Sequence, residues 1–345
     1  MRVGSLFSGY GGLDMAVGGD LAWYSEIEPA ACRVMEAHHP GVPNIGDVTR
    51  VDWSEVEPVD VLTGGYPCQP FSQAGHRKGA EDERHLWPHV RDAISALGPQ
   101  VTVLENVRGH LTLGFASVLA DLADLGLSAR WGVVRAADAG APHNRARLFI
   151  VATRDSGYDA GGTELGEQQE TSTGGIVRAV ESVADAEGSR WRAREGHSAD
   201  TSGQFNTRVG YRDRSSATDS DGIEDGYGIH RGRTSNPEFE SVGVGNIKCD
   251  TDSRSSDYIS ENEIGITFGP YAQAVERWRR ILGRPVPRPT IQRNERDRLS
   301  PVFVEWMMGL PEGWVTGHGL SVSQELKLLG NGVVPQQARL ALELL

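Results

Sequence analysis

Short apolar strands alternate with amphipathic helices throughout the first 154 residues, and this alternation constrains the fold more than any other feature. Strands that alternate with helices over short connections are typical of a doubly wound α/β sheet of the Rossmann type. Such sheets bind ligands at the carboxyl ends of their strands. We expect strands at residues 3–7, 21–27, 59–62, 101–104, 129–135 and 147–152, and helices at 13–17, 29–38, 86–97 and 115–125.

The composition changes at about Asp155. Residues 155–270 are rich in Gly, Ser, Thr and Asp and carry few large apolar side chains, which predicts a smaller, loop-rich second region. Regular patterns then return as a helix at 271–283, an extended segment at 284–298, and helices at 301–310 and 336–345.

The formal net charge is -13, which argues against a uniformly basic surface. Residues 271–299 are nevertheless strongly basic. A solvated helix face would explain this stretch, and so would contacts to the phosphates of a nucleic acid. The arginines concerned are Arg277, Arg279, Arg280, Arg284, Arg288, Arg293, Arg296 and Arg298.

The cysteines and the hydropathy pattern exclude several classes of protein. Cys32, Cys68 and Cys249 have no paired spacing, so we expect neither a disulfide framework nor a metal site, and we expect a reducing, cytoplasmic compartment. No apolar run approaches the ~18 residues of a membrane-spanning helix. The N-terminus leads directly into a strand pattern, which leaves no room for a signal peptide.

A glycine-rich turn, Phe7-Ser8-Gly9-Tyr10-Gly11-Gly12, follows the first expected strand. Such a turn lets the backbone approach a ligand, although alone it fits NAD, FAD, other nucleotides or simple turn chemistry. Glu26 ends the second strand, where an acidic residue commonly binds ribose hydroxyls, and Asp47 could accept a hydrogen bond from an adenine amino group. Together these residues predict a nucleoside-containing cofactor.

Cys68 lies between Pro67 and Gln69-Pro70, directly after an apolar strand. Proline fixes its own φ and restricts the preceding residue, so the cysteine is held on a stiff loop, as suits a nucleophile. A free cysteine is otherwise most often a small buried hydrophobic residue, and this segment alone leaves both interpretations open.

A carboxylate and an arginine pair follow at later strand ends. Glu105, in Glu105-Asn106-Val107, could stay protonated through desolvation in a pocket and donate a hydrogen bond. Arg145 and Arg147 precede a strand and, as an i, i+2 pair on an extended segment, point to one face. They would anchor anionic or carbonyl groups, or form a salt bridge at the rim.

These motifs, in this order, resemble the cytosine-5 DNA methyltransferases that use S-adenosylmethionine. The resemblance covers roughly residues 1–154 and 298–345. The motifs that carry it are Phe7–Gly12, Pro67-Cys68-Gln69, Glu105-Asn106-Val107, Arg145-Ala146-Arg147 and Gly330-Asn331-Gly332-Val333-Val334-Pro335.

The resemblance implies a catalytic and cofactor-binding domain at 1–154, a target recognition region at 155–300 and a returning C-terminal segment at 301–345. Cys68 would be the nucleophile, Glu105 would hold nitrogen 3 of a flipped-out cytosine, and Arg145 and Arg147 would support the base and its carboxylate partner. The cofactor pocket would be lined by Phe7, Gly9, Gly11, Glu26, Asp47 and Asn331.

The chain departs from the family pattern at two positions. His143 stands where the family usually has glutamine, and Ile27 where a larger side chain often packs on adenine. We expect double-stranded DNA as the partner of a monomeric enzyme, with a cognate restriction endonuclease as a candidate second partner. A transfer RNA cytosine methyltransferase and a catalytically silent DNA-binding relative remain as alternatives.

Overall fold

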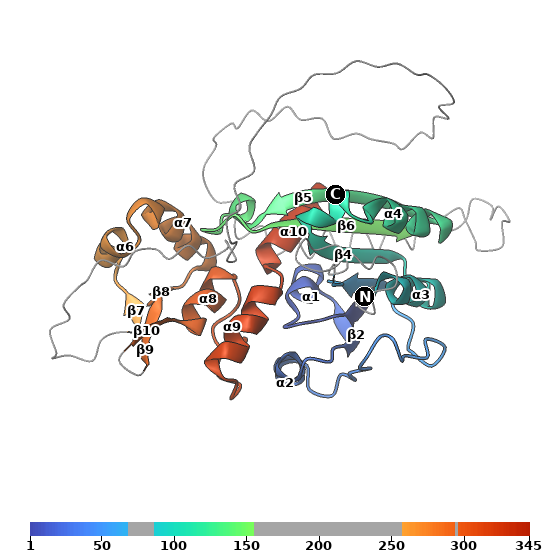
Figure 1. The fold of residues 1–345 in the computed structure, drawn as a ribbon, viewed down its shortest axis with the longest axis horizontal. Coiled ribbons are helices and arrows are strands. Elements are labelled where there is room, and N and C mark those ends of the chain that lie inside the picture. Colours follow the sequence, from blue (N-terminus) through green and yellow to red (C-terminus); the bar gives the residue numbers. More distant parts are fainter. Residues whose placement is uncertain (68–85, 155–256, 294–295) are drawn as a thin grey trace, which may run out of the picture. The chain divides into compact units, whose positions relative to one another are not determined.

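The computed structural model describes residues 1–67, 86–154, 257–293 and 296–345. Within these ranges the first half of the chain forms a six-stranded sheet with the strand order β2-β1-β3-β4-β6-β5 (Figure 1). The strands are β1 (Arg2–Leu6), β2 (Asp20–Ser25), β3 (Val61–Gly64), β4 (Val101–Val107), β5 (Leu127–Arg135) and β6 (Ala146–Arg154).

Four strands of this sheet are parallel. β1 pairs in parallel with both β2 and β3, and β3 pairs in parallel with β4. β6 is antiparallel to both of its neighbours, β4 and β5. Because the chain moves from β1 to one side for β2 and to the other for β3, the strand order reverses between β1 and β3, and such a point favours ligand binding at the carboxyl ends.

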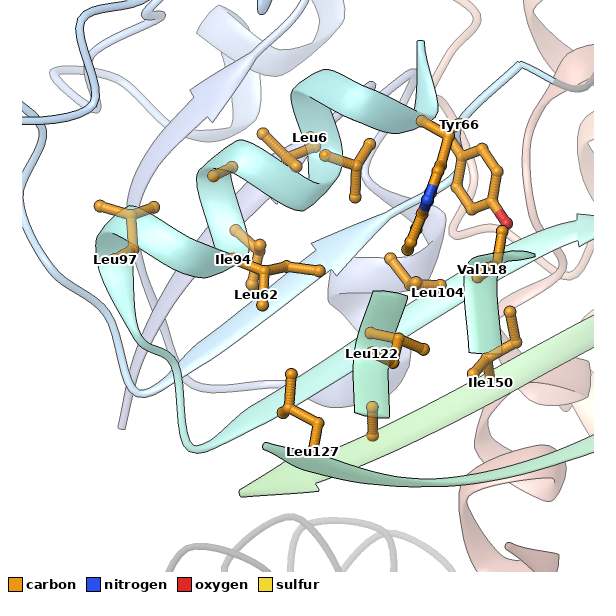
Figure 2. Packing of buried hydrophobic residues seen from close by; sticks show 14 of the residues in the cluster. Leu6, Leu62, Tyr66, Ile94, Leu97, Leu104, Val118, Leu122, Leu127 and Ile150 are labelled. Atoms are coloured by element: carbon orange, nitrogen blue, oxygen red, sulfur yellow. The ribbon is translucent and has the colours of Figure 1, made fainter. Parts of the chain in front are cut away.

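The helices of this half are α1 (Gly12–Val17), α2 (Pro29–His38), α3 (Trp87–Leu97) and α4 (Phe115–Asp124), with the 3₁₀ helices η3 (Arg108–Thr112) and η4 (Ala136–Ala139). Figure 2 shows Ile94 of α3 and Leu122 of α4 packed against Leu62, Leu104 and Ile150 of the sheet. All five side chains are fully buried, so these helices are fixed to one face by apolar packing.

The second half comprises α6 (Glu261–Phe268), η5 (Gly269–Tyr271), α7 (Ala272–Leu282), α8 (Pro301–Met307), α9 (Val322–Asn331) and α10 (Pro335–Leu344). Two small antiparallel sheets accompany them, one of β7 (Tyr258–Ile259) with β8 (Val286–Pro287), the other of β9 (Thr290–Arg293) with β10 (Arg296–Leu299). A second hydrophobic cluster joins this half to the first, since Trp278 of α7 and Trp306 of α8 share it with Tyr10 and Val34.

The expected α/β fold with a mostly parallel sheet is confirmed. α2 has the expected bounds, and the other expected elements of residues 1–154 agree within a few residues. Two helices were missed, α6 and α9. Each begins with a capping box, Ser260 with Glu263 and Ser321 with Gln324, which is a signal readable in the sequence.

Candidate active site

A cavity of about 200 Å³ opens at the carboxyl ends of β1 and β3, where the strand order reverses. This volume is many times that of one water molecule. The glycine turn, the end of β2, the end of β4 and helix α9 all contribute to its wall. Its lining includes Phe7, Gly9, Glu26, Glu105 and Asn331, so five residues singled out from the sequence meet at one place.

Backbone conformation brings the glycine turn against the cavity. Phe7 has φ 53, the one positive φ among the described non-glycine residues, and Gly9 and Gly11 have φ 56 and φ 79. A left-handed non-glycine residue costs on the order of 1–3 kcal/mol and persists where the surroundings impose it. The amide of Gly9 donates to Oε2 of Glu26 at 2.8 Å, which ties the turn to the end of β2.

Glu26 is held by three backbone amides. Its Oε1 accepts hydrogen bonds from the amides of Ile27 and Glu28, each at 2.8 Å, while Oε2 faces Gly9. The carboxylate is therefore oriented before any ligand arrives, with lone pairs left to accept from neighbouring hydroxyls. Ile27 beside it is 68% exposed.

Glu105 forms a buried ion pair. Its Oε1 lies 2.9 Å from Nε of Arg147, and the two side chains are 12% and 13% exposed. Burial raises the pKa of Glu105, while Arg147 and then Arg145 oppose this rise. Such a carboxyl, pushed toward its protonated form beside fixed cations, holds a proton more readily than an exposed carboxyl group does.

Cys68 itself lies outside the described residues, but the chain leading to it is fixed. Asn106 donates from Nδ2 to the carbonyl of Tyr66 at 3.0 Å, and the hydroxyl of Tyr66 lies 2.8 Å from Nε2 of His110. A Cβ added at Gly65 would lie 3.4 Å from Oε2 of Glu105. The Glu105 carboxylate therefore lies close to the chain three residues before Cys68.

The C-terminal segment packs on the glycine turn. The hydroxyl of Tyr10, which is fully buried, donates to the carbonyl of Val333 at 2.7 Å, and Trp314 donates from Nε1 to the carbonyl of Tyr10 at 2.8 Å. Arg145 donates to the carbonyl of Gly332 at 2.8 Å. These contacts place Asn331 on the cavity, although it is distant from the turn in sequence.

Two expected cofactor residues do not line the cavity as it is formed here. Gly11 is not among the lining residues, and a Cβ added there would lie 3.2 Å from the sulfur of Met35. Asp47 closes a local turn in which Oδ1 accepts from the amide of Thr49 at 3.0 Å and from its hydroxyl at 2.8 Å. These bonds lower the pKa of Asp47. His143 contacts the carbonyl of Met307 at 3.1 Å, and burial lowers its pKa.

Sequence reasoning missed several residues that build the site. Tyr10, Trp314 and His110 hold its segments together, and Asp14 lines the cavity. Asp14 was detectable as an acidic residue in the first turn of the helix after the glycine turn. The partners of the aromatic residues lie far away in sequence, so no local pattern signals their contacts.

The arginines of 277–298 separate into two groups. The first group makes contacts within the protein: Arg277 donates to Gly140, Arg279 and Arg280 pair with Glu276, Arg284 donates to Leu310, and Arg288 pairs with Glu263. The second group lies on β9 and β10. Arg293, Arg296 and Arg298 are exposed there and border a cavity with Val322 and Ser323 of α9.

A doubly wound sheet with a cavity at its switch point, flanked by a glycine turn and two oriented carboxylates, is typical of the class of α/β enzymes that bind a nucleoside-containing ligand. Within this class, residues 1–343 match the family model described as C-5 cytosine-specific DNA methylase. The chain belongs to this family. The resemblance to this family that the sequence motifs indicated is thereby confirmed.

Curated relatives come from bacteria and a phage. The type II methyltransferase M.NlaIV of Neisseria lactamica is 35% identical over 147 residues, 39% of this chain and 35% of that protein. M.NlaX of the same organism is 35% identical over 162 residues, 44% of this chain and 51% of that protein. The orphan methyltransferase M.SPRI of Bacillus phage SPR is 35% identical over 167 residues, which are 45% of this chain and 38% of that protein. The matched stretch therefore spans at most about half the length of these relatives.

Solved structures share the fold at low identity. The S. pombe Dnmt2 methyltransferase superposes with a TM-score of 0.52 at 17% identity, covering 100% of this chain and 98% of that one. The Entamoeba histolytica methyltransferase EhMeth superposes with a TM-score of 0.52 at 14% identity, covering 99% of this chain and 96% of that one. In the described part of the chain, every helix is too short or too polar to cross a membrane.

Proposed function

We propose that this protein transfers a methyl group from S-adenosylmethionine to carbon 5 of cytosine in a specific double-stranded DNA sequence. One observation carries the proposal. A single cavity is lined both by the glycine turn with Glu26, suited to a nucleoside, and by Glu105, which is paired with Arg147. Membership of the cytosine-5 DNA methylase family supports the same reaction.

The residues present fit S-adenosylmethionine. Among the described lining residues the one cation is Lys327, and it pairs with Glu28 at 3.1 Å, so the wall is built for a nucleoside rather than for a pyrophosphate. Glu26 would accept from the ribose hydroxyls, Phe7, Gly9 and Asn331 would enclose the cofactor, and Gly11 and Asp47 belong to the same proposed set. When bound, the cofactor supplies an electrophilic methyl group.

Cys68 is the proposed nucleophile. Its thiolate, the reactive form of the side chain, would add to carbon 6 of cytosine and form a carbon–sulfur bond. The ring electrons displaced by this addition make carbon 5 nucleophilic, so that it can take up the methyl group. Loss of the proton from carbon 5 then restores the ring double bond and expels Cys68. The target atoms are covered in a duplex, so the cytosine must leave the stack.

Glu105 would donate its proton to nitrogen 3 of the cytosine as Cys68 attacks. This donation offsets the negative charge that develops on the ring. The raised pKa of Glu105 favours the protonated donor, and Arg147 limits the rise so that the proton can be released. Arg145 and Arg147 thus act in the proposal as supports of this carboxyl group and of the base.

We assign residues 1–154 to catalysis and cofactor binding, 155–300 to target recognition and 301–345 to the returning segment. The contacts of Tyr10 with Val333 support the last assignment. Arg293, Arg296 and Arg298 are the proposed phosphate contacts, because the other arginines of this stretch already have protein partners. Most of 155–300 lies outside the described residues.

Duplex DNA is the proposed substrate of a monomeric, cytoplasmic enzyme. Relatives named type II methyltransferases support a cognate restriction endonuclease as a second partner, whereas the phage relative is named an orphan enzyme.

Transfer of labelled methyl from S-adenosylmethionine to unmethylated duplex DNA, followed by base-resolution mapping of 5-methylcytosine, tests the function. We expect methylation at one short motif. Cys68→Ala should abolish transfer while leaving DNA binding intact, and Cys249→Ala is the matched control. Normal turnover by Cys68→Ala would refute the covalent mechanism, and transfer to transfer RNA alone would refute the DNA substrate.

A further inference from the structure

Asp14 is a partly buried carboxylate to which the proposed mechanism gives no role. It lies in the first turn of α1 and lines the cavity. Its Oδ2 accepts a hydrogen bond from the hydroxyl of Ser5 at 2.7 Å, and its Oδ1 accepts one from the hydroxyl of Thr63 at 2.5 Å. Both partners are neutral, and they hold the carboxylate between the carboxyl-end halves of β1 and β3.

The other carboxylates on the cavity wall are compensated. Glu105 is paired with Arg147, and Glu28 is paired with Lys327. Glu26 accepts hydrogen bonds from three backbone amides. Asp14 differs from all three, because within the described part of the chain it has two hydroxyl donors and makes no ion pair.

The surroundings of Asp14 provide little positive charge. His39 is the one basic group among the described residues that acts on it electrostatically, and burial lowers the pKa of His39, so this ring is mainly neutral at pH 7. Partial burial of a carboxylate without a cation is costly, because it removes part of the hydration and the two neutral hydrogen bonds replace only some of what is lost. A ligand that brings a positive charge to the cavity would recover this cost.

We propose that Asp14 is the anionic partner of the cationic methionine end of S-adenosylmethionine and determines selectivity for that end. This inference rests on the proposed function. The cofactor carries an ammonium and a sulfonium group, whereas Glu26 would serve the uncharged ribose at the other end. The cavity would therefore recognise the two halves of one ligand with two different carboxylates, one held by amides and one held by hydroxyls.

Isothermal titration calorimetry on the full chain tests this assignment without measuring turnover. The probes are S-adenosylmethionine, S-adenosylhomocysteine, which lacks the sulfonium, and 5′-methylthioadenosine, which lacks both cations. The variant is Asp14→Asn, which keeps the size of the side chain, and the Ser5 and Thr63 hydroxyls can rotate to suit the amide. Asp20→Asn is the control, because it removes the same charge from an exposed residue at the opposite end of β2.

We expect Asp14→Asn to lower the affinity for S-adenosylmethionine about tenfold or more, as for loss of a charged hydrogen bond. The affinity for methylthioadenosine should change less than about twofold. An equal loss for S-adenosylhomocysteine assigns Asp14 to the ammonium, and a smaller loss assigns it to the sulfonium. Equal weakening of methylthioadenosine, or unchanged affinity for S-adenosylmethionine, overturns the inference. Failure of the unmodified protein to bind S-adenosylmethionine would refute the proposed function itself.

Discussion

Arg147 should contribute to stability mainly by compensating the charge of Glu105, and Arg147→Leu tests this. The two side chains are 13% and 12% exposed and their charged atoms lie 2.9 Å apart. Removing one member of a buried ion pair typically costs about 3–5 kcal/mol, because the other charge is left without a partner. Arg145 also acts on Glu105, so we expect the lower end, about 3 kcal/mol at pH 8.

The pH dependence of this destabilisation follows from the pKa of Glu105. Burial raises that pKa in the folded protein above its ordinary value. Below the unfolded pKa the carboxyl group is neutral in both states, and stability is lost as pH rises through the folded pKa. Without Arg147 the folded pKa rises further. The difference between variant and unmodified protein should therefore be smaller at pH 5, close to the unfolded pKa, than at pH 8.

Urea unfolding measures the destabilisation by Arg147→Leu at pH 5 and at pH 8. Arg2→Leu is the matched control, because the Arg2–Glu57 pair is exposed at 46% and 53% and should contribute at most about 1 kcal/mol. A destabilisation by Arg147→Leu that is the same at both pH values would show that side-chain packing, and not charge, accounts for it. A destabilisation no larger than that of the control would refute the description of Glu105 as a carboxylate that depends on Arg147.

Two further predictions concern other parts of the molecule. Replacing Arg293, Arg296 and Arg298 together with alanine should weaken DNA binding at all sequences. The slope of log affinity against log salt concentration should fall by about 3, one for each phosphate that is no longer neutralised. A slope equal to that of a control triple variant at exposed arginines elsewhere would show that these three residues do not bind DNA. Gly332→Ala should destabilise the fold by about 1–3 kcal/mol in urea unfolding, because a Cβ there would overlap the buried ring of Tyr10, and unchanged stability would show that this packing can relax.

The polar residues of the site were predictable to different degrees. Glu26 and Glu105 were recognisable because each ends an expected strand, and the carboxyl ends of neighbouring parallel strands meet at one edge. The pairing of Glu105 with Arg147 required the antiparallel register of β4 with β6, which places Val107 opposite Arg147. Asp47 was singled out by its sequence position as a cofactor ligand, and the structure adds that its Oδ1 accepts hydrogen bonds from Thr49 in a local turn.

The arginine-rich stretch 277–298 also combines a feature visible in the sequence with contacts that only the structure shows. Its charge was visible in the sequence, but only the packing of α7 and α8 showed which arginines already have protein partners. Arg288, first expected to contact phosphate, pairs with Glu263 at 3.6 Å, whereas Arg298 is exposed on β10 beside Arg296. Ion pairs between distant elements depend on their arrangement in space and leave no periodic signal.

The sequence by itself determined the α/β class, the bounds of α2, the family and the residue types at the strand ends. These depend on hydrophobic periodicity and on short motifs, which act over a few residues. The tertiary structure decided which of those residues share a cavity, because Tyr10, Val333 and Trp314 bring the C-terminal segment onto the glycine turn from about 300 residues away in sequence. It also decided that Asp14 makes no ion pair with the described residues, since compensation of a partly buried charge depends on every neighbour in space and not on neighbours in the chain.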